Sequence, residues 1–191
     1  PLCFLIMAFR RQIGEYLAAL RDWRVLRLLL VSSVLIALNW LVYIYSIFTD
    51  HVLAASLGYY LNPLVNVMLG MIFLGERLSR LQALAVVIAG IGVAILLAGA
   101  LDTLWISLTL AFSFGAYGLI RKVVPVGSLP GLAIETTLLL PLAVGGAVYY
   151  IWLGDGRGFG SEADISWLLA AGGVVTAVPL LLFATAARRM S

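Results

Sequence analysis

Two asparagines one helical turn apart lie in the middle of a long apolar run. Asn62 and Asn66 share one face of a predicted helix, and Asn62 directly precedes Pro63. Pro63 has no N–H, so the carbonyl of Tyr59 loses its helical partner. Side-chain amides and a freed carbonyl deep in a membrane helix can coordinate a solute or an ion. They can also hold neighbouring helices together, at about 0.6–2 kcal/mol each, and the sequence leaves both interpretations open.

Polar and aromatic residues recur near the middle of three further apolar runs. Each residue taken singly fits core packing. Together they give several helices a polar position at mid-depth, which a purely structural bundle does not require. With Tyr59, Asn62 and Asn66 they form our candidate set for solute binding: Asn39 and Trp40 in one run, Ser113 and Tyr117 in a second, and Thr176, which precedes Pro179, in a third.

Glu135 is the only acidic residue inside an apolar run. A charge at the centre of a bilayer costs about 2.5–3.5 kcal/mol on insertion scales, and less near the surface. One hypothesis makes Glu135 a coupling residue that loads and unloads a proton, or that holds a cationic solute. The other makes it a structural carboxylate paired with Arg121 or Lys122, and we favour this second one.

The composition places all these residues in lipid. Of the 191 residues, 63% are hydrophobic and 11% are charged, whereas soluble domains are about 45–50% apolar and about 25% charged. The mean hydropathy is +1.11 and the pI is about 9.3. Cys3 is the single cysteine and His51 the single histidine, and the chemical motifs of metalloproteases, serine hydrolases and phosphate-binding loops are absent from the sequence. We therefore predict no metal, no cofactor and no enzyme.

Continuous apolar runs predict membrane-spanning helices, because a span needs about 20 apolar residues. Residues 1–9 are too short for a span, and we interpret them as the end of a helix that starts before Pro1. With that run, seven segments are expected; the other six are Leu28–Phe48, Leu53–Gly75, Ala83–Leu101, Leu104–Ile120, Leu132–Leu153 and Trp167–Ala187.

The basic residues fix an orientation for these segments. Eleven of them fall in alternate connections, and only Arg157 falls on the other side, where most loop acids also lie. Basic loops remain in the cytoplasm, so the basic charge marks membrane topology rather than a nucleic-acid partner. The eleven are Arg10, Arg11, Arg21, Arg24, Arg27, Arg77, Arg80, Arg121, Lys122, Arg188 and Arg189.

A weak internal similarity appears at an offset of 140 residues. The run that starts at Leu28 aligns with the run that starts at Leu168, and Asn39 then falls opposite Pro179. The two segments cross the membrane in opposite directions. Such inverted repeats are typical of secondary transporters.

Several motifs resemble the EamA-type members of the drug/metabolite transporter superfamily. The stretch from Asn62-Pro63 to Gly75-Glu76-Arg77 resembles the end of that family's fourth span, and residues 110–122 resemble its sixth span with a basic exit. The RarD branch is the nearest resemblance, and it extends along almost the whole chain. The motifs that carry it are Asn39-Trp40, Ala55-Ser56-Leu57-Gly58-Tyr59, Ile134-Glu135-Thr136 and Val178-Pro179-Leu180.

The resemblance implies an all-α fold of ten spans in two inverted repeats. On that map residues 1–101 are the remainder of the first repeat, spans two to five, and residues 102–191 begin the second, spans six to eight. Gly75, Glu76 and Arg77 then form a cytoplasmic motif, and helix-breaking prolines are expected at Pro63, Pro141 and Pro179.

The implied function is a multi-pass permease of the bacterial inner membrane. It would carry a small organic solute by alternating access, as a secondary-active transporter. The alternative from a different class is a non-transporting scaffold or assembly protein. The expected partners are the lipid bilayer and a small-molecule solute, with no nucleic acid, and a homodimer is left open.

Overall fold

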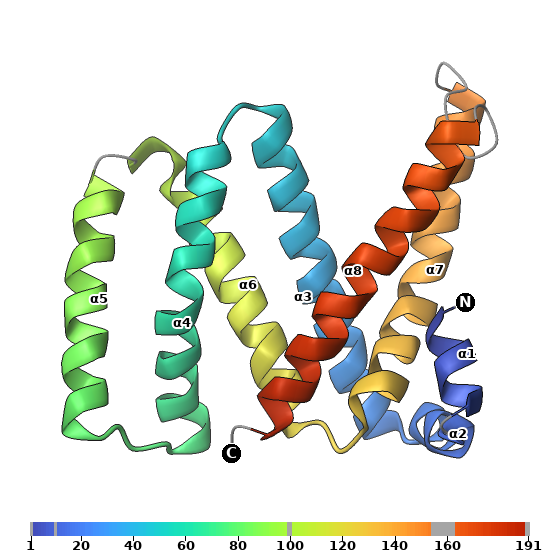
Figure 1. Cartoon of the computed structure of the whole chain (residues 1–191), viewed down its shortest axis with the longest axis horizontal. Helices are drawn as coiled ribbons and strands as arrows, with labels where there is room; N and C mark the ends of the chain where they lie inside the picture. Colours follow the sequence, from blue (N-terminus) through green and yellow to red (C-terminus); the bar gives the residue numbers. More distant parts are fainter. Residues whose placement is uncertain (1, 10, 99–100, 154–162, 190–191) are drawn as a thin grey trace. The chain divides into compact units, whose positions relative to one another are not determined.

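The computed structural model describes residues 2–9, 11–98, 101–153 and 163–189, and these residues form helices joined by short connections (Figure 1). The predicted all-α fold class is confirmed. The helices are α1 (Leu2–Phe9), α2 (Ile13–Arg21), α3 (Trp23–Phe48), α4 (Val52–Leu74), α5 (Arg80–Ala98), a 3₁₀ turn at Leu101–Thr103, α6 (Leu104–Val123), α7 (Ser128–Leu153) and α8 (Ala163–Arg189).

Four stretches within the described residues are long and apolar enough to cross a membrane: Trp23–Phe48, Val52–Leu74, Leu101–Val123 and Ser128–Tyr149. Shorter apolar stretches lie in α5, at Arg80–Leu96, and in α8, at Ala171–Phe183. Large apolar side chains such as Leu41, Ile72 and Ile95 are exposed on these helices. A surface of this kind is stable in lipid and not in water, so the chain is a polytopic helical membrane protein.

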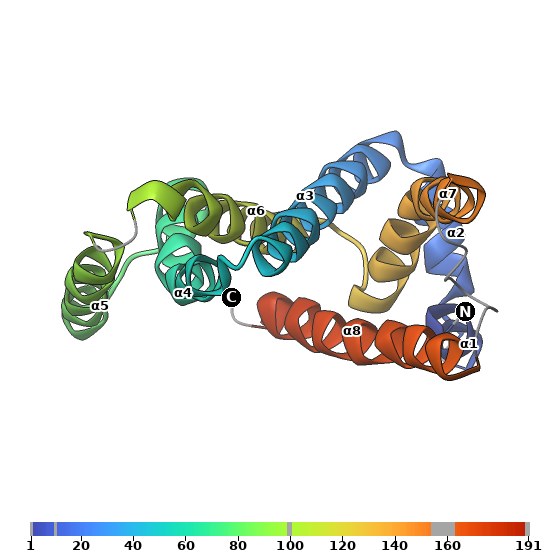
Figure 2. The ribbon, with the colours of Figure 1, turned by 90° about the horizontal axis from the view of Figure 1, so that it is seen from above.

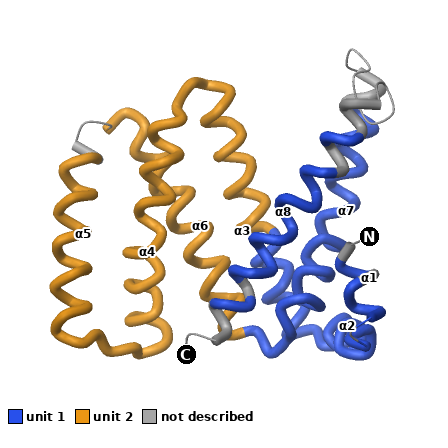
Figure 3. Tube along the Cα trace, in the orientation of Figure 1, with its two compact units in different colours: residues 1–33, 124–191 blue, residues 34–123 orange. Residues whose placement is uncertain are grey.

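The chain divides into two compact units (Figure 3). Unit 1 comprises residues 1–33 and 124–191, and unit 2 comprises residues 34–123. This division into compact units is a property distinct from the two sequence repeats, 1–101 and 102–191, which stay a prediction.

Unit 2 is organised by the parallel pair α4 and α6. Contacts between them run in step along both helices: the Ser107 hydroxyl donates to the Ala54 carbonyl at 2.7 Å near one end, and Lys122 contacts Glu76 at the other. Both helices therefore point the same way, and α5 connects them by running back. Figures 1 and 2 show α4 between α5 and α6.

Glycine makes the close approach of α4 and α6 possible. A Cβ on Gly58 would lie 2.9 Å from both Leu110 Cβ and the Ser107 carbonyl oxygen. Further along the pair, a Cβ on Gly115 would lie 2.7 Å from Val65 Cγ1. Small residues at a membrane-helix interface let backbones approach, so that dispersion and polar contacts can hold the helices together.

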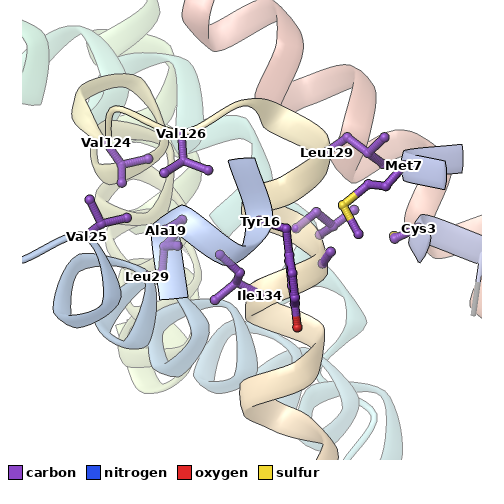
Figure 4. Close-up of a cluster of buried hydrophobic side chains, with 12 residues drawn as sticks. Cys3, Met7, Tyr16, Ala19, Val25, Leu29, Val124, Val126, Leu129 and Ile134 are labelled. Carbon is purple, nitrogen blue, oxygen red and sulfur yellow. The ribbon is translucent and has the colours of Figure 1, made fainter. Parts of the chain in front are cut away.

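Unit 1 is built around the first turns of α7 (Figure 4). Met7 of α1, Tyr16 of α2 and Leu29 of α3 are buried with Ile134 of α7 in one apolar cluster. The Tyr16 hydroxyl lies 3.4 Å from Thr137 Oγ1. Leu180 of α8 packs against the same cluster at its edge.

The N-terminal connection corrects the sequence prediction. Residues 10–27 were expected to form a basic loop, but α2 occupies Ile13–Arg21 and α3 begins at Trp23 rather than Leu28. Asp22 ends one helix and caps the next, because its Oδ1 accepts the N–H groups of Arg24 at 2.9 Å and Val25 at 3.4 Å. The hydropathy of the run cannot locate this start, since the first turn of α3 carries arginines.

The sequence predicted that three prolines would break their helices, and in the structure they do not. Pro63, Pro141 and Pro179 lie inside continuous helices, α4, α7 and α8. A proline removes one backbone hydrogen bond, and the turns on either side keep theirs, so a long helix in lipid continues through it.

The described basic residues of unit 2 follow the predicted alternation. Arg77 lies in the connection from α4 to α5, and Lys122 lies at the end of α6 on the same side as that connection. Asp50 and Asp102 lie in the connections at the opposite ends of these helices. Arg10 and Arg157, like most of the expected loop Gly154–Ser166, fall outside the described residues.

Candidate functional site

Asn39 is a buried link between α3 and α6. Its side chain is almost inaccessible, and Nδ2 donates to the Leu110 carbonyl at 2.9 Å and to Ser113 Oγ at 3.0 Å. Ser113 is also buried and donates in turn to the Leu110 carbonyl at 3.3 Å. Both amide hydrogens of Asn39 are used within unit 2. The arrangement supports the interpretation that Asn39 and Ser113 hold two helices together.

Tyr59 of α4 contacts the amide oxygen of Asn39. Its hydroxyl lies 3.5 Å from Asn39 Oδ1, the outer limit of a hydrogen bond, and its ring meets Tyr43 edge-to-face with centroids 5.8 Å apart. Tyr59 and Tyr43 are both partly exposed, as is Trp40. These three aromatic side chains are thus accessible, whereas the Asn39–Ser113 hydrogen bond beside them is buried.

Asn62 is the unusual polar residue of α4. Its side chain is 9% exposed, and its Oδ1 is buried without a hydrogen-bond partner among the described residues. An unpaired buried polar group costs about 1–3 kcal/mol, so such a group in a native structure commonly binds a water, an ion or a ligand. Pro63 follows immediately, and its missing N–H leaves the Tyr59 carbonyl without an i+4 donor.

Asn66 lies one turn further along α4 and is exposed. Its Oδ1 faces Gly115 of α6, where an added Cβ would lie 3.4 Å from it. The side chains of Asn62 and Asn66 and the Tyr59 carbonyl therefore form a short row of acceptor oxygens near the middle of a helix about 35 Å long. Such a row suits a ligand that donates hydrogen bonds or carries positive charge.

Two other predicted residues have different surroundings. Tyr117 is completely buried in unit 2, and its ring centroid lies 6.1 Å from that of Phe114 on the same helix. Thr176 belongs to unit 1, where its hydroxyl donates to the Gly172 carbonyl of its own helix at 2.7 Å. The structure thus brings together Asn39, Tyr59 and Ser113 in unit 2, with Asn62 and Asn66 on the neighbouring turns of α4.

Glu135 lies in unit 1, about 10 Å from the start of α7, and is almost fully buried. Ser32 of α3 donates to its Oε1 at 2.5 Å. The Ser32 hydroxyl also lies 3.0 Å from the Leu29 carbonyl, and among the described residues Ser33 donates only to that carbonyl of its own helix, at 2.7 Å. A hydroxyl donor offsets part of the cost of burying a carboxylate. Two adjacent serines inside one apolar run are the sequence signal that could have indicated this contact.

The predicted cytoplasmic motif, Gly75-Glu76-Arg77, follows α4 and contacts α6. Gly75 has φ 66°, the left-handed conformation that ends many helices and that glycine adopts without strain. Glu76 Oε1 accepts a hydrogen bond from Lys122 Nζ at 2.5 Å. Its other oxygen, Oε2, packs against Gly70, where an added Cβ would lie only 2.6 Å from it. Arg77 is exposed. Lys122, one of the partners suggested for Glu135, thus contacts Glu76 within unit 2.

Sequence reasoning missed the residues that hold α4 on α6. Ser107, Gly58 and Gly115 do not stand out in the sequence, because small residues are frequent in apolar helices. Only the pairing of the two helices shows that Gly58 and Ser107 face each other.

The fold defines a polytopic helical membrane protein, and comparison with known proteins gives its family. Residues 1–98 match the EamA-like transporter family. Among its relatives, an uncharacterized transporter of Pseudomonas aeruginosa is 49% identical over 181 residues, covering 88% of this chain and 59% of the relative. Protein RarD of Salmonella typhimurium is 44% identical over 190 residues, and Protein RarD of Escherichia coli is 43% identical over 196, each covering 97% of this chain and 63% of the relative.

The chain belongs to the EamA-like transporter family and, within it, to the RarD branch. Its family and the names of its relatives indicate membrane transport rather than enzyme catalysis. The chain spans 54–63% of the length of the first relatives it matches. No solved structure matches it.

Proposed function

We propose that this protein is a secondary-active carrier of a small organic solute in the bacterial inner membrane, working by alternating access. Family membership supports transport. The mid-membrane row of acceptor oxygens on α4 supports a solute site at the depth where alternating-access carriers bind their substrates.

The observation that carries the proposal is the buried amide oxygen of Asn62, which has no hydrogen-bond partner among the described residues. A scaffold gains nothing from it, because an apolar side chain would pack at lower cost. A carrier gains a group that is satisfied only when a solute arrives, so that binding recovers the cost. Asn66 lies exposed one turn away, where it offers a second amide to the same solute.

The test uses the full-length protein in proteoliposomes. A thermal-shift screen of small solutes first identifies a stabilising compound, and uptake of that compound is then measured for Asn62→Leu and Asn66→Leu. We expect both variants to fold and to lose at least about tenfold in transport, the effect of about 1.4 kcal/mol of lost binding. Ser56→Ala is the matched control on the same helix, since the exposed Ser56 hydroxyl donates, within the part of the chain that the structure describes, only to the Val52 carbonyl of α4.

Two results would contradict the proposal. Normal uptake by both leucine variants would move the solute site away from α4. Absence of saturable uptake by the unaltered protein for every solute in the screen would favour a scaffold instead.

Glu135 is the candidate for proton coupling. Glu135→Gln keeps the shape of the side chain and removes its charge. A coupling role predicts normal expression with the pH dependence of uptake abolished. A structural role predicts lower stability and uptake that still varies with pH. The Ser32 contact and the burial of Glu135 are compatible with both roles, and this variant separates them.

The proposed orientation places Arg77 in the cytoplasm. A protein with Arg77→Cys, in which Cys3 and every other native cysteine are replaced by Ala, should be protected from an impermeant thiol reagent added outside intact cells. Asp50→Cys, in the connection at the other ends of α3 and α4, should react. Labelling of position 77 from outside would reverse the topology.

A further inference from the structure

A short amphipathic helix, α2, lies crosswise to α1 and α7 at one end of unit 1, as both ribbon views show (Figures 1 and 2). Two local features set this direction. Arg11 follows α1 with a left-handed φ of 53°, and Asp22 follows α2 in an extended conformation. Because α7 contains a candidate membrane span, a helix crosswise to it at its end lies along the membrane surface.

One face of α2 is packed and the adjacent face is open. Tyr16 and Ala19 are buried against the core of unit 1. Ile13 and Leu17, one turn apart, remain 46% and 51% exposed, and Arg21 continues the same row one turn later. An apolar stripe that ends in arginine is the pattern of a helix that rests in the boundary between acyl chains and headgroups.

The surroundings of this stripe are strongly basic. Arg11, Arg21, Arg24 and Arg27 are all exposed, and none of the four makes an ion pair within the described residues. The two nearby carboxylates have backbone partners, since Glu15 accepts the Gly127 N–H at 2.5 Å and Asp22 accepts the N–H of Arg24.

Trp23 completes the surface at the first residue of α3. It is 65% exposed, and tryptophan prefers the headgroup level of a bilayer, where its ring is half in lipid and half in water. Its exposure would be costly in water and is favourable at that depth.

We propose that α2 and the start of α3 form a binding surface for anionic phospholipids, with Ile13, Leu17 and Trp23 among the acyl chains and the four arginines on the phosphates. The surface is independent of the solute site in unit 2. Lipid is the occupant because the basic side chains surround an apolar stripe, which a free anion does not need.

The experiment follows quenching of tryptophan fluorescence by brominated lipids in vesicles that hold the full-length protein, with the Trp23→Phe signal subtracted. Brominated phosphatidylglycerol should quench Trp23 more strongly than brominated phosphatidylcholine. Each basic residue near an anionic surface strengthens binding to anionic lipid about fivefold, equivalent to about 1 kcal/mol. Arg21→Gln with Arg24→Gln should therefore lower the preference for phosphatidylglycerol about 25-fold.

Matched variants make the test specific. Arg77→Gln with Arg80→Gln removes the same charge from the connection between α4 and α5 and should leave the quenching of Trp23 unchanged. Arg21→Lys with Arg24→Lys should keep most of the preference, and inorganic phosphate should not compete. Equal quenching by the two lipids, an equal loss in the Arg77 and Arg80 variant, or displacement by phosphate would each overturn the proposal.

Discussion

The contrast between Asn39 and Asn62 gives the sharpest test of the site. Both are buried amides on spanning helices of unit 2, but Asn39 makes two hydrogen bonds through Nδ2, whereas Asn62 Oδ1 has none among the described residues. Asn→Leu keeps the branched skeleton and removes the polarity at either position. The two variants carry the same increase in volume, so its cost largely cancels when they are compared.

The two variants should differ in their effect on stability. Asn39→Leu loses two interhelical hydrogen bonds, worth about 0.6–1.7 kcal/mol each in a membrane protein, and should lower the free energy of unfolding by about 1–3 kcal/mol. Asn62→Leu removes an unpaired buried oxygen, whose burial costs about 1–3 kcal/mol, and should leave stability unchanged or raise it. Asn62→Leu should therefore be more stable than Asn39→Leu by about 1–6 kcal/mol.

Thermal unfolding of the full-length protein in a fixed detergent measures this gap. About 1 kcal/mol shifts Tm by about 2–4 °C for chains of about 150–250 residues, so the variants should separate by several degrees. Solute added at saturation should raise the Tm of the unaltered protein and not that of Asn62→Leu. Equal destabilisation by both substitutions would refute the reasoning, because the Asn62 amide would then have a structural partner.

Three further predictions concern packing and polar contacts. Gly58→Ala should destabilise the protein by about 1–3 kcal/mol in thermal unfolding, because its Cβ would meet the Ser107 carbonyl and Leu110 at 2.9 Å. Gly92→Ala, where an added Cβ has nothing within 4 Å, should instead stabilise it by about 0.5–1 kcal/mol. Similar effects of the two substitutions would contradict the close approach of α4 and α6. Ser32→Ala removes a donor to the buried Glu135 and should cost about 1–3 kcal/mol, while Ser33→Ala, whose hydroxyl bonds its own helix, should cost clearly less in the same assay. Glu76→Gln should cost at most about 1 kcal/mol, since the Lys122 pair is partly exposed, and a double-mutant cycle with Lys122→Met should show a coupling that falls as salt is raised; a coupling insensitive to salt would indicate a buried pair instead.

Continuous apolar runs of sufficient length predicted most of the helices, because lipid requires each spanning segment to satisfy its own backbone. α4 and α6 therefore begin within one residue of the predicted runs. Boundaries failed where polar residues continue a helix beyond the apolar stretch, as at Arg24 of α3 and Ser128 of α7. The helix α2 was missed because it is short and because Gly14, Glu15 and Arg21 interrupt its apolar residues. Only the burial of Tyr16 and Ala19 in the core of unit 1 makes its packed face evident.

The sequence by itself determined the class of protein, the family motifs and the set of polar residues that lie within apolar runs, since hydropathy and residue identity are properties of the chain alone. It could not decide which of those polar residues have partners. Asn39 and Asn62 look alike in the sequence, since each is an amide inside an apolar run. They differ because the packing of α3 against α6 brings the Leu110 carbonyl and Ser113 to Asn39, whereas no described residue makes a hydrogen bond to Asn62 Oδ1. Hydrogen bonding depends on distances between helices, and those distances exist only in the tertiary structure.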